Sequence, residues 1–219
     1  QWILTAFRGT EPTKLKDFIT DGDFLQEDSG QGGKVHSGFL EAFREIWFQA
    51  GLSSYLDTLL KTKKRPLWFT GHSLGGALAT LAADHHPAAT GLYTFGSPRV
   101  GNWAFRRDFK VPHFRFVHNL DLITHLPPMI PVISPYVHVG KAVRISAIGR
   151  LISTISDARK KAAGEESWTK IVADKLKGSL RYLFDHAPAY YAVFTWNSYL
   201  DFLDGVELPE ETEQVTPDL

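Results

Sequence analysis

Short apolar runs alternate along the 219-residue chain with segments in which apolar residues recur every three or four positions. The apolar runs that predict strands cover residues 2–7, 67–70, 92–95 and 114–117. Between several of these predicted strands, apolar residues recur at the spacing of a helix. Strands that alternate with helices are typical of a mainly parallel sheet covered on both faces, so the pattern predicts the α/β class.

Three helices are predicted between these strands. The first begins at Ser37, and Gly51 is expected to bend or divide it before the basic residues at 61–65, which suit the negative end of a helix. The second covers residues 74–83 and is rich in Ala and Leu, which both favour helices. The third is expected to follow Asn102, whose side chain can cap it, and to run to Phe109.

The remaining segments have weaker patterns. Residues 11–33 are polar and rich in Asp and Gly, which predicts a lid-like loop with one or two helical turns. Residues 136–139 are expected to form a final edge strand. Residues 141–183 are expected to be helical, as an insertion packed on the sheet or as a hinged cap. The first apolar stripe of this insertion consists of Ile145, Ile148, Leu151, Ile152 and Ile155.

Composition narrows the choice of function. The chain has 24 basic and 24 acidic residues, and this balance does not suggest a nucleic-acid partner. It has no cysteine, which excludes disulfides and thiol chemistry, and no apolar run long enough to span a membrane. The length predicts a single domain over residues 1–219. The start at Gln1 is interpreted as a mature, trimmed or incomplete N-terminus.

The sequence Gly-His-Ser-Leu-Gly at 71–75 connects a predicted strand to a predicted helix. A serine in such a turn projects from the top of a sheet, where it can act as a nucleophile, so Ser73 is the first candidate for catalysis. The alternative is a glycine-rich helix start that binds a phosphate or nothing. A phosphate loop of the Walker type would carry Lys after its last glycine, whereas this chain has Gly76 and Ala77.

A serine nucleophile requires a histidine base and a carboxylate that orients the base. In doubly wound hydrolases the acid follows the serine and the histidine comes last. Asp121 follows the predicted strand at 114–117 and is the candidate acid, since Asp108 is interpreted as a surface charge. Spacing alone leaves three candidates for the base, with His186 preferred to His138 and then His125. The other histidines are interpreted as structural or as too early in the chain.

The developing oxyanion requires hydrogen-bond donors. The motif predicts one of them, the backbone N–H of Leu74. Thr10, which follows the first predicted strand, is expected to supply the second through its N–H and its hydroxyl. The alternative role of Thr10 is an N-cap for a helical turn in the loop that follows.

Several motifs, taken in order, resemble the class 3 lipases, the fungal-type triacylglycerol lipase family of α/β-hydrolases. They are Phe-Arg-Gly-Thr at 7–10, His-Ser-Gly-Phe at 36–39, Thr-Gly-His-Ser-Leu-Gly-Gly at 70–76, Gly-Ser-Pro-Arg-Val-Gly-Asn at 96–102 and His-Asn-Leu-Asp at 118–121. The resemblance implies the α/β-hydrolase fold. It also implies roles for five residues: nucleophile Ser73, acid Asp121, base His186, and oxyanion-hole residues Thr10 and Leu74. His138 matches a family pattern that is not the base.

The resemblance further implies a carboxylic ester hydrolase that acts on lipid esters, without a metal or organic cofactor and with possible contact to a lipid–water interface. Secretion is favoured over a cytoplasmic location. Alternatives are a phospholipase A1, a soluble-ester or feruloyl-type esterase, and a catalytically silent lipid-binding scaffold. The chain departs from the family because it begins at the Phe-Arg-Gly-Thr strand, lacks a lid tryptophan and has a longer segment at 141–183.

Overall fold

The computed structural model describes residues 1–10, 24–127, 129–130, 134–146, 149, 151–152 and 185–203. The chain divides into two compact units. The first unit comprises Gln1–Phe116 and Leu122–Ala142, and the second comprises Val117–Asp121 and Val143–Leu219. The prediction of a single domain over residues 1–219 stays a prediction.

The four strands expected from the apolar runs are all present and parallel. They are β1 (Ile3–Phe7), β4 (Leu67–His72), β5 (Ala89–Phe95) and β6 (His113–His118). Phe7 lies opposite Gly71, and Gly71 lies opposite Thr94, so the carboxyl ends of three strands are in register. The strand order is β1-β4-β5-β6-β9-β10, in which β9 (Lys141–Ile145) and β10 (Leu151–Ile152) pair antiparallel. This arrangement confirms the mainly parallel α/β sheet.

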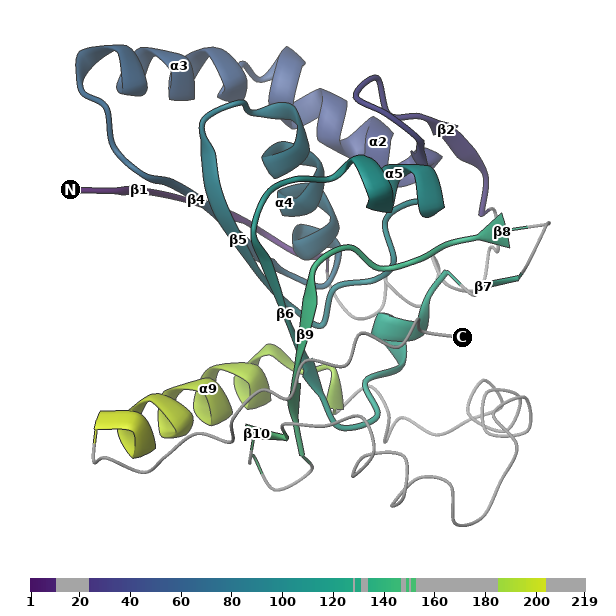
Figure 1. The fold of residues 1–219 in the computed structure, drawn as a ribbon, viewed down its shortest axis with the longest axis vertical. Helices are drawn as coiled ribbons and strands as arrows, with labels where there is room; N and C mark the ends of the chain where they lie inside the picture. The colour runs from purple at the N-terminus through teal and green to yellow at the C-terminus, as the bar shows by residue number, and fades with distance from the viewer. Residues whose placement is uncertain are drawn as a thin grey trace. The chain divides into compact units, whose positions relative to one another are not determined.

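The helices of the first unit lie on one side of β1, β4 and β5 (Figure 1). They are α2 (Ser37–Arg44), which continues as the π-helical turn η1 (Glu45–Gln49), α3 (Leu52–Thr62), α4 (Leu74–His85) and α5 (Trp103–Asp108). Their common side follows from the strand order, because strands added in one direction with right-handed crossovers place every connecting helix on the same face. Gly51, with φ 76°, divides α3 from η1 as expected.

The main core lies between these helices and the sheet. Its buried side chains include Phe39, Leu40, Phe43, Trp47, Leu56, Leu67, Phe69, Leu81, Leu92 and Phe105. Burial alternates along β4, where Leu67 and Phe69 face this core and Trp68 faces the opposite side. On that opposite face the ring of Tyr93 lies 5.7 Å from Trp68 and 5.6 Å from Phe114, and these rings are only half-buried. The helical side therefore supplies the well-packed core of this unit.

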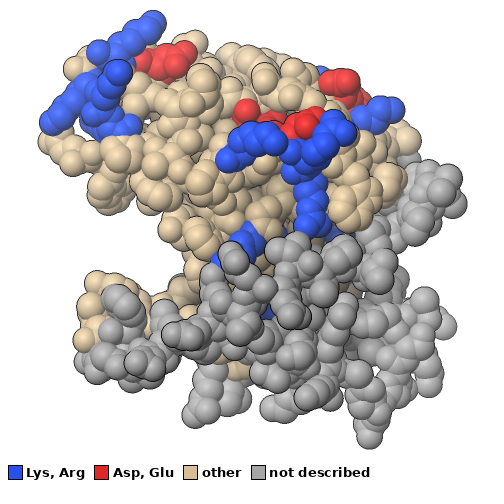
Figure 2. All heavy atoms as spheres, viewed as in Figure 1, with Lys and Arg blue, Asp and Glu red and all other residues tan. Residues whose placement is uncertain are grey.

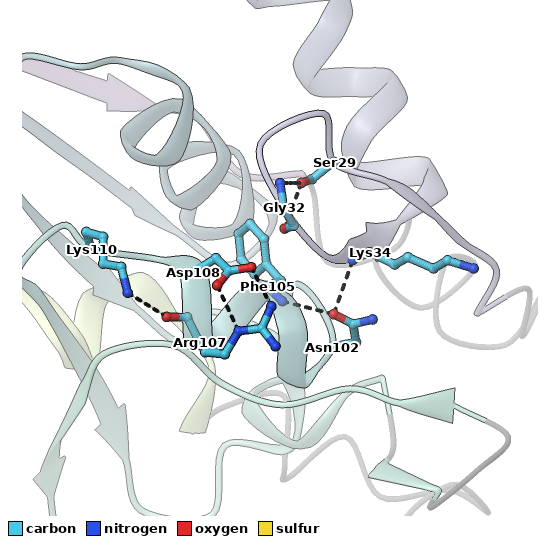
Figure 3. A network of polar contacts seen from close by, with 8 residues as sticks. All are labelled: Ser29, Gly32, Lys34, Asn102, Phe105, Arg107, Asp108 and Lys110. Carbon is cyan, nitrogen blue, oxygen red and sulfur yellow. Dashed lines mark hydrogen bonds and ion pairs between the residues drawn. The ribbon is translucent and has the colours of Figure 1, made fainter.

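Local contacts fix the ends of the helices. Asn102 caps α5 as predicted: its Oδ1 accepts the N–H of Phe105 at 3.0 Å and also that of Lys34 at 3.1 Å (Figure 3). Basic side chains gather where α3 ends (Figure 2), and a guanidinium nitrogen of Arg65 donates to the Leu59 carbonyl at 3.4 Å. Two further strand pairs are antiparallel, namely β2 (Gln26–Asp28) with β3 (Lys34–His36) and β7 (Met129–Ile130) with β8 (Ser134–Pro135).

The second unit corrects one prediction from the sequence. Residues 145–155 were expected to form a helix, but Ile145 belongs to β9 and pairs with Leu151 of β10. Gly149, with φ 80°, lies between the two strands, and a Cβ at this position would overlap the ring of Phe194 in α9 (Pro188–Leu203). Apolar residues spaced by three to six positions fit a helix or two short strands across a turn equally well. Gly149, with its positive φ, favours the turn.

Other expectations have mixed outcomes. The prediction of an edge strand at 136–139 is wrong. Of these four residues only Val137 pairs, through an isolated bridge to Gly101, and the last strand of the sheet is β10. The helical turns predicted near residue 15 and the remainder of the predicted insertion, residues 153–184, lie outside the described residues. A short 3-10 helix, Leu122–His125, follows Asp121.

Candidate active site

Ser73 occupies the turn between β4 and α4 in a backbone conformation that non-glycine residues rarely adopt. Its φ is 58° and its ψ is −128°, and its side chain is buried. The backbone N–H of Ser73 donates to the Phe95 carbonyl at 3.0 Å, which ties the turn to the end of β5. Within the part of the chain that the structure describes, the Ser73 hydroxyl has no hydrogen-bond partner. A strained, anchored serine of this kind is typical of functional sites.

Glycines on both sides of Ser73 allow the close approach of strand and helix. A Cβ on Gly71 would overlap the Gly75 carbonyl, and a Cβ on Gly75 would overlap the Phe7 carbonyl of β1. The turn therefore requires glycine at both positions because of space, and not only because of backbone freedom.

The segment after β1 lies against the same turn. A Cβ on Gly9 would lie 2.7 Å from the His72 carbonyl oxygen and 3.5 Å from the Ser73 Cβ. Thr10, the next residue, is half-buried, and its alternative role as an N-cap concerns residues outside the described part. Leu74 is the first residue of α4, where backbone N–H groups have no acceptor within the helix and the dipole is positive. Both positions carry donors next to the serine turn.

In the second unit, Asp121 and His186 form a buried pair. The His186 Nδ1 donates to both carboxylate oxygens of Asp121, at 3.0 and 2.8 Å. Asp121 is 0% exposed and His186 is 5% exposed. An imidazole whose Nδ1–H is bound to a buried carboxylate has its Nε2 available as a base, and the carboxylate stabilises the cation that forms on protonation.

The rival histidines have other contacts. The Nε2 of His138 donates to the Thr124 carbonyl at 2.7 Å, and burial together with the Arg115 charge lowers the pKa of His138 well below its usual range. The backbone carbonyl of His125 accepts from Arg99 at 2.6 Å, a contact that does not involve its imidazole ring. His85 and His86 end α4, as expected for structural histidines. The acid and base preferred from spacing are thus the two residues that the structure pairs.

Sequence analysis missed Tyr191. Its hydroxyl donates to the Oδ2 of Asp121 at 2.6 Å and accepts the backbone N–H of His118 at 3.0 Å. Burial and then the Asp121 charge raise the pKa of Tyr191 well above its usual range, so the phenol stays protonated. The available signal was its position five residues after His186, on the aromatic helix at the end of the chain.

Among the residues that the structure describes, no group of three or more His, Asp and Glu side chains could hold a metal ion. None of the helices in the described ranges combines the length and apolar character needed to cross a bilayer.

Comparison with known proteins identifies the family. The family model for lipase (class 3) matches residues 4–130, which is more than half of the chain. The protein therefore belongs to the class 3 lipase family, and its fold is the α/β-hydrolase fold.

Individual relatives are consistent with this assignment. A lipase of Rhizomucor miehei is 34% identical over 139 residues, which cover 58% of this chain and 38% of that protein. The secreted mono- and diacylglycerol lipase 1 of Fusarium solani is 38% identical over 141 residues, which cover 58% of this chain and 40% of that protein. The crystal structure of a lipase from Rhizopus microsporus var. chinensis matches with a TM-score of 0.55 and 34% identity, over 65% of this chain and 52% of that chain.

The chain spans about two fifths of the length of these curated relatives.

Proposed function

We propose that this protein is a carboxylic ester hydrolase that acts on lipid esters through an acyl-enzyme formed on Ser73. The observation that carries the proposal is the backbone of Ser73, which is held at φ 58° in a strand–turn–helix junction. The buried Asp121–His186 pair supports it, because that pair is the arrangement a serine nucleophile requires. Membership of the class 3 lipase family supports the choice of ester hydrolysis.

In the proposed cycle His186 accepts the Ser73 proton as the serine attacks the ester carbonyl. Asp121 orients His186 and stabilises its cation. The N–H groups of Leu74 and Thr10, with the Thr10 hydroxyl, stabilise the oxyanion. His186 then donates the proton to the leaving alcohol, and water, activated by the same histidine, releases the acid. The cycle uses neither a metal nor an organic cofactor.

Lipid esters are the substrate class that we favour over small soluble esters. The matched Fusarium solani protein is named as a mono- and diacylglycerol lipase. In addition, α9 carries no charged residue between Pro188 and Leu200, and one side of it presents exposed aromatic and aliphatic side chains. These are Val193, Trp196, Tyr199, Leu200 and Leu203, each at least 40% exposed. Such a face favours contact with a lipid–water interface.

Secretion is proposed as well, since the same Fusarium solani protein is named as secreted. Residues 11–28 are proposed to act as a lid, because the resemblance to the class 3 lipases aligns them with the lid of that family.

The test is hydrolysis of a medium-chain triglyceride at concentrations that cross its solubility limit, with Ser73→Ala as the blank. Ser73→Ala is expected to lower turnover roughly a thousandfold or more, and a covalent serine probe should label the native protein but not this variant. A rate that jumps above the solubility limit supports an interfacial lipase. A rate that saturates below it supports an esterase, and equal turnover by native protein and Ser73→Ala contradicts the proposal.

A further inference from the structure

The Tyr191 hydroxyl contacts the proposed acid but has no part in the cycle described above. Its hydrogen bond to the Asp121 Oδ2 is 2.6 Å long, within the range of a strong bond to a charged acceptor. Tyr191 is 2% exposed and Asp121 is 0% exposed. At such a buried place water cannot readily replace a lost donor, so removal of this hydroxyl leaves the carboxylate with one donor fewer to hold its orientation.

A second set of contacts holds the residue before His186. The His118 Nδ1 donates to the Asp185 carbonyl at 3.0 Å, and the Asn119 side-chain amide donates to the Asp185 carboxylate at 2.9 Å. Because the His118 backbone N–H also binds Tyr191, the end of β6 contacts the chain on both sides of His186. The turn that carries the acid is therefore bonded to residues that precede and follow the base.

We propose that Tyr191 is a positioning residue for ester hydrolysis: it fixes the Asp121 carboxylate toward His186, while His118 and Asn119 hold residue 185 beside them. The inference rests on the proposed function, because positioning affects turnover only if Asp121 and His186 serve as acid and base.

The hydroxyl also has an electrostatic effect. By donating to Asp121 it draws negative charge from the carboxylate and weakens the attraction of Asp121 for a proton on His186. Two other titratable groups lie beside this pair, His118 and Asp185, which contact each other, and Tyr191→Phe removes neither of them. Loss of the Tyr191 hydroxyl is therefore expected to move the acidic limb of the pH profile of kcat/KM to higher pH.

The main experiment compares Tyr191→Phe with Tyr190→Phe. Tyr190 is the neighbouring phenol and is 41% exposed, and its hydroxyl makes no hydrogen bond within the described part of the chain, which makes it a matched control. Tyr191→Phe is expected to lower kcat roughly tenfold to a hundredfold with little change in KM, as for loss of a hydrogen bond to a charged group. It should also move the acidic limb upward by about half a pH unit. Tyr190→Phe should change neither.

A second variant, Asn119→Gly, tests the support at residue 185. Asn119 has φ 43°, which glycine adopts without strain, so this change removes the amide and leaves the backbone free to keep its conformation. A lower kcat with an unmoved acidic limb is expected, since this variant alters position and not the charge on Asp121. This variant also serves if Tyr191→Phe does not fold, and an unchanged kcat in Asn119→Gly then contradicts the inference.

Proton NMR separates failure of this inference from failure of the proposed function. The downfield resonance of the His186 Nδ1 proton, assigned by its loss in His186→Gln, reports the bond to Asp121 without any turnover. If the native protein hydrolyses no ester, the proposed function fails, while a resonance that shifts in Tyr191→Phe still shows that the hydroxyl orients Asp121 toward His186. Native kcat, an unmoved pH profile and an unchanged resonance in Tyr191→Phe would overturn the inference.

Discussion

Replacement of Asp84 by Asn is expected to stabilise the protein at alkaline pH and not at acidic pH. Asp84 lies in the last turn of α4 with a largely buried side chain, and its Oδ2 has no hydrogen-bond partner among the described residues. Burial and then the Asp108 charge raise the pKa of Asp84 from 3.8 to about 6. The Nδ1 of His85 lies 4.0 Å from the Asp84 Oδ2 and donates to the Leu81 carbonyl instead.

The direction in which stability changes with pH follows from proton linkage. Because the pKa of Asp84 is higher in the folded state, the folded state binds more protons than the unfolded state between about pH 4 and pH 6. The free energy of unfolding therefore falls as the pH rises through this range, and the full penalty remains above pH 6. A shift of about two pH units corresponds to about 3 kcal/mol at most, and solvent screening of this partly accessible carboxyl reduces the expected penalty to about 1–2 kcal/mol.

The assay is urea unfolding of native protein and Asp84→Asn at pH 4.5 and pH 8. The measured quantity is the difference in unfolding free energy between variant and native protein, because other titrating groups cancel in it. We expect this difference to be about 0.5–1 kcal/mol more favourable to the variant at pH 8 than at pH 4.5, because the unfolded carboxyl is already mostly ionised at pH 4.5 and part of the penalty is present there. Asp108→Asn should remove only part of the pH dependence, since burial is the larger cause of the raised pKa. A difference that is equal at both pH values, or larger at pH 4.5, would refute the reasoning.

Three further predictions concern the site and its supports. His186→Ala should abolish nearly all esterase turnover and His138→Ala should retain most of it in the triglyceride assay, and the reverse result would assign the base to His138. Asn102→Ala should lower the free energy of urea unfolding by about 1–2 kcal/mol because two backbone N–H groups lose their acceptor, whereas Asn102→Asp should lose less. Gly71→Ala should destabilise the protein by about 3 kcal/mol or more, because the added Cβ would overlap Gly75. Gly51 has open space around it but a φ of 76°, so Gly51→Ala should cost about 1 kcal/mol. Equal losses of unfolding free energy in the two variants would contradict the argument from space.

Local patterns predicted much of the fold because they depend on neighbouring residues. The apolar runs at 67–70 and 92–95 have the length of strands, and the glycines around Ser73 fit only a tight strand–turn–helix junction. The Asn102 cap could also be predicted, since its acceptor and the N–H of Phe105 are three residues apart. By contrast, the stripe that contains Ile145 and Leu151 was misassigned to a helix, because apolar spacing does not record the turn at Gly149.

What the sequence determined by itself is the candidate nucleophile, the parallel α/β pattern and a short list of acids and bases, because each depends on residue types at fixed short separations. It ordered His186, His138 and His125 only by preference. The pairing of His186 with Asp121, 65 residues earlier, and the bond from Tyr191 to the same carboxylate were decided by the tertiary structure. Their physical basis is burial: a carboxylate that is withdrawn from water requires donors from the chain, and only the folded backbone determines which donors reach it.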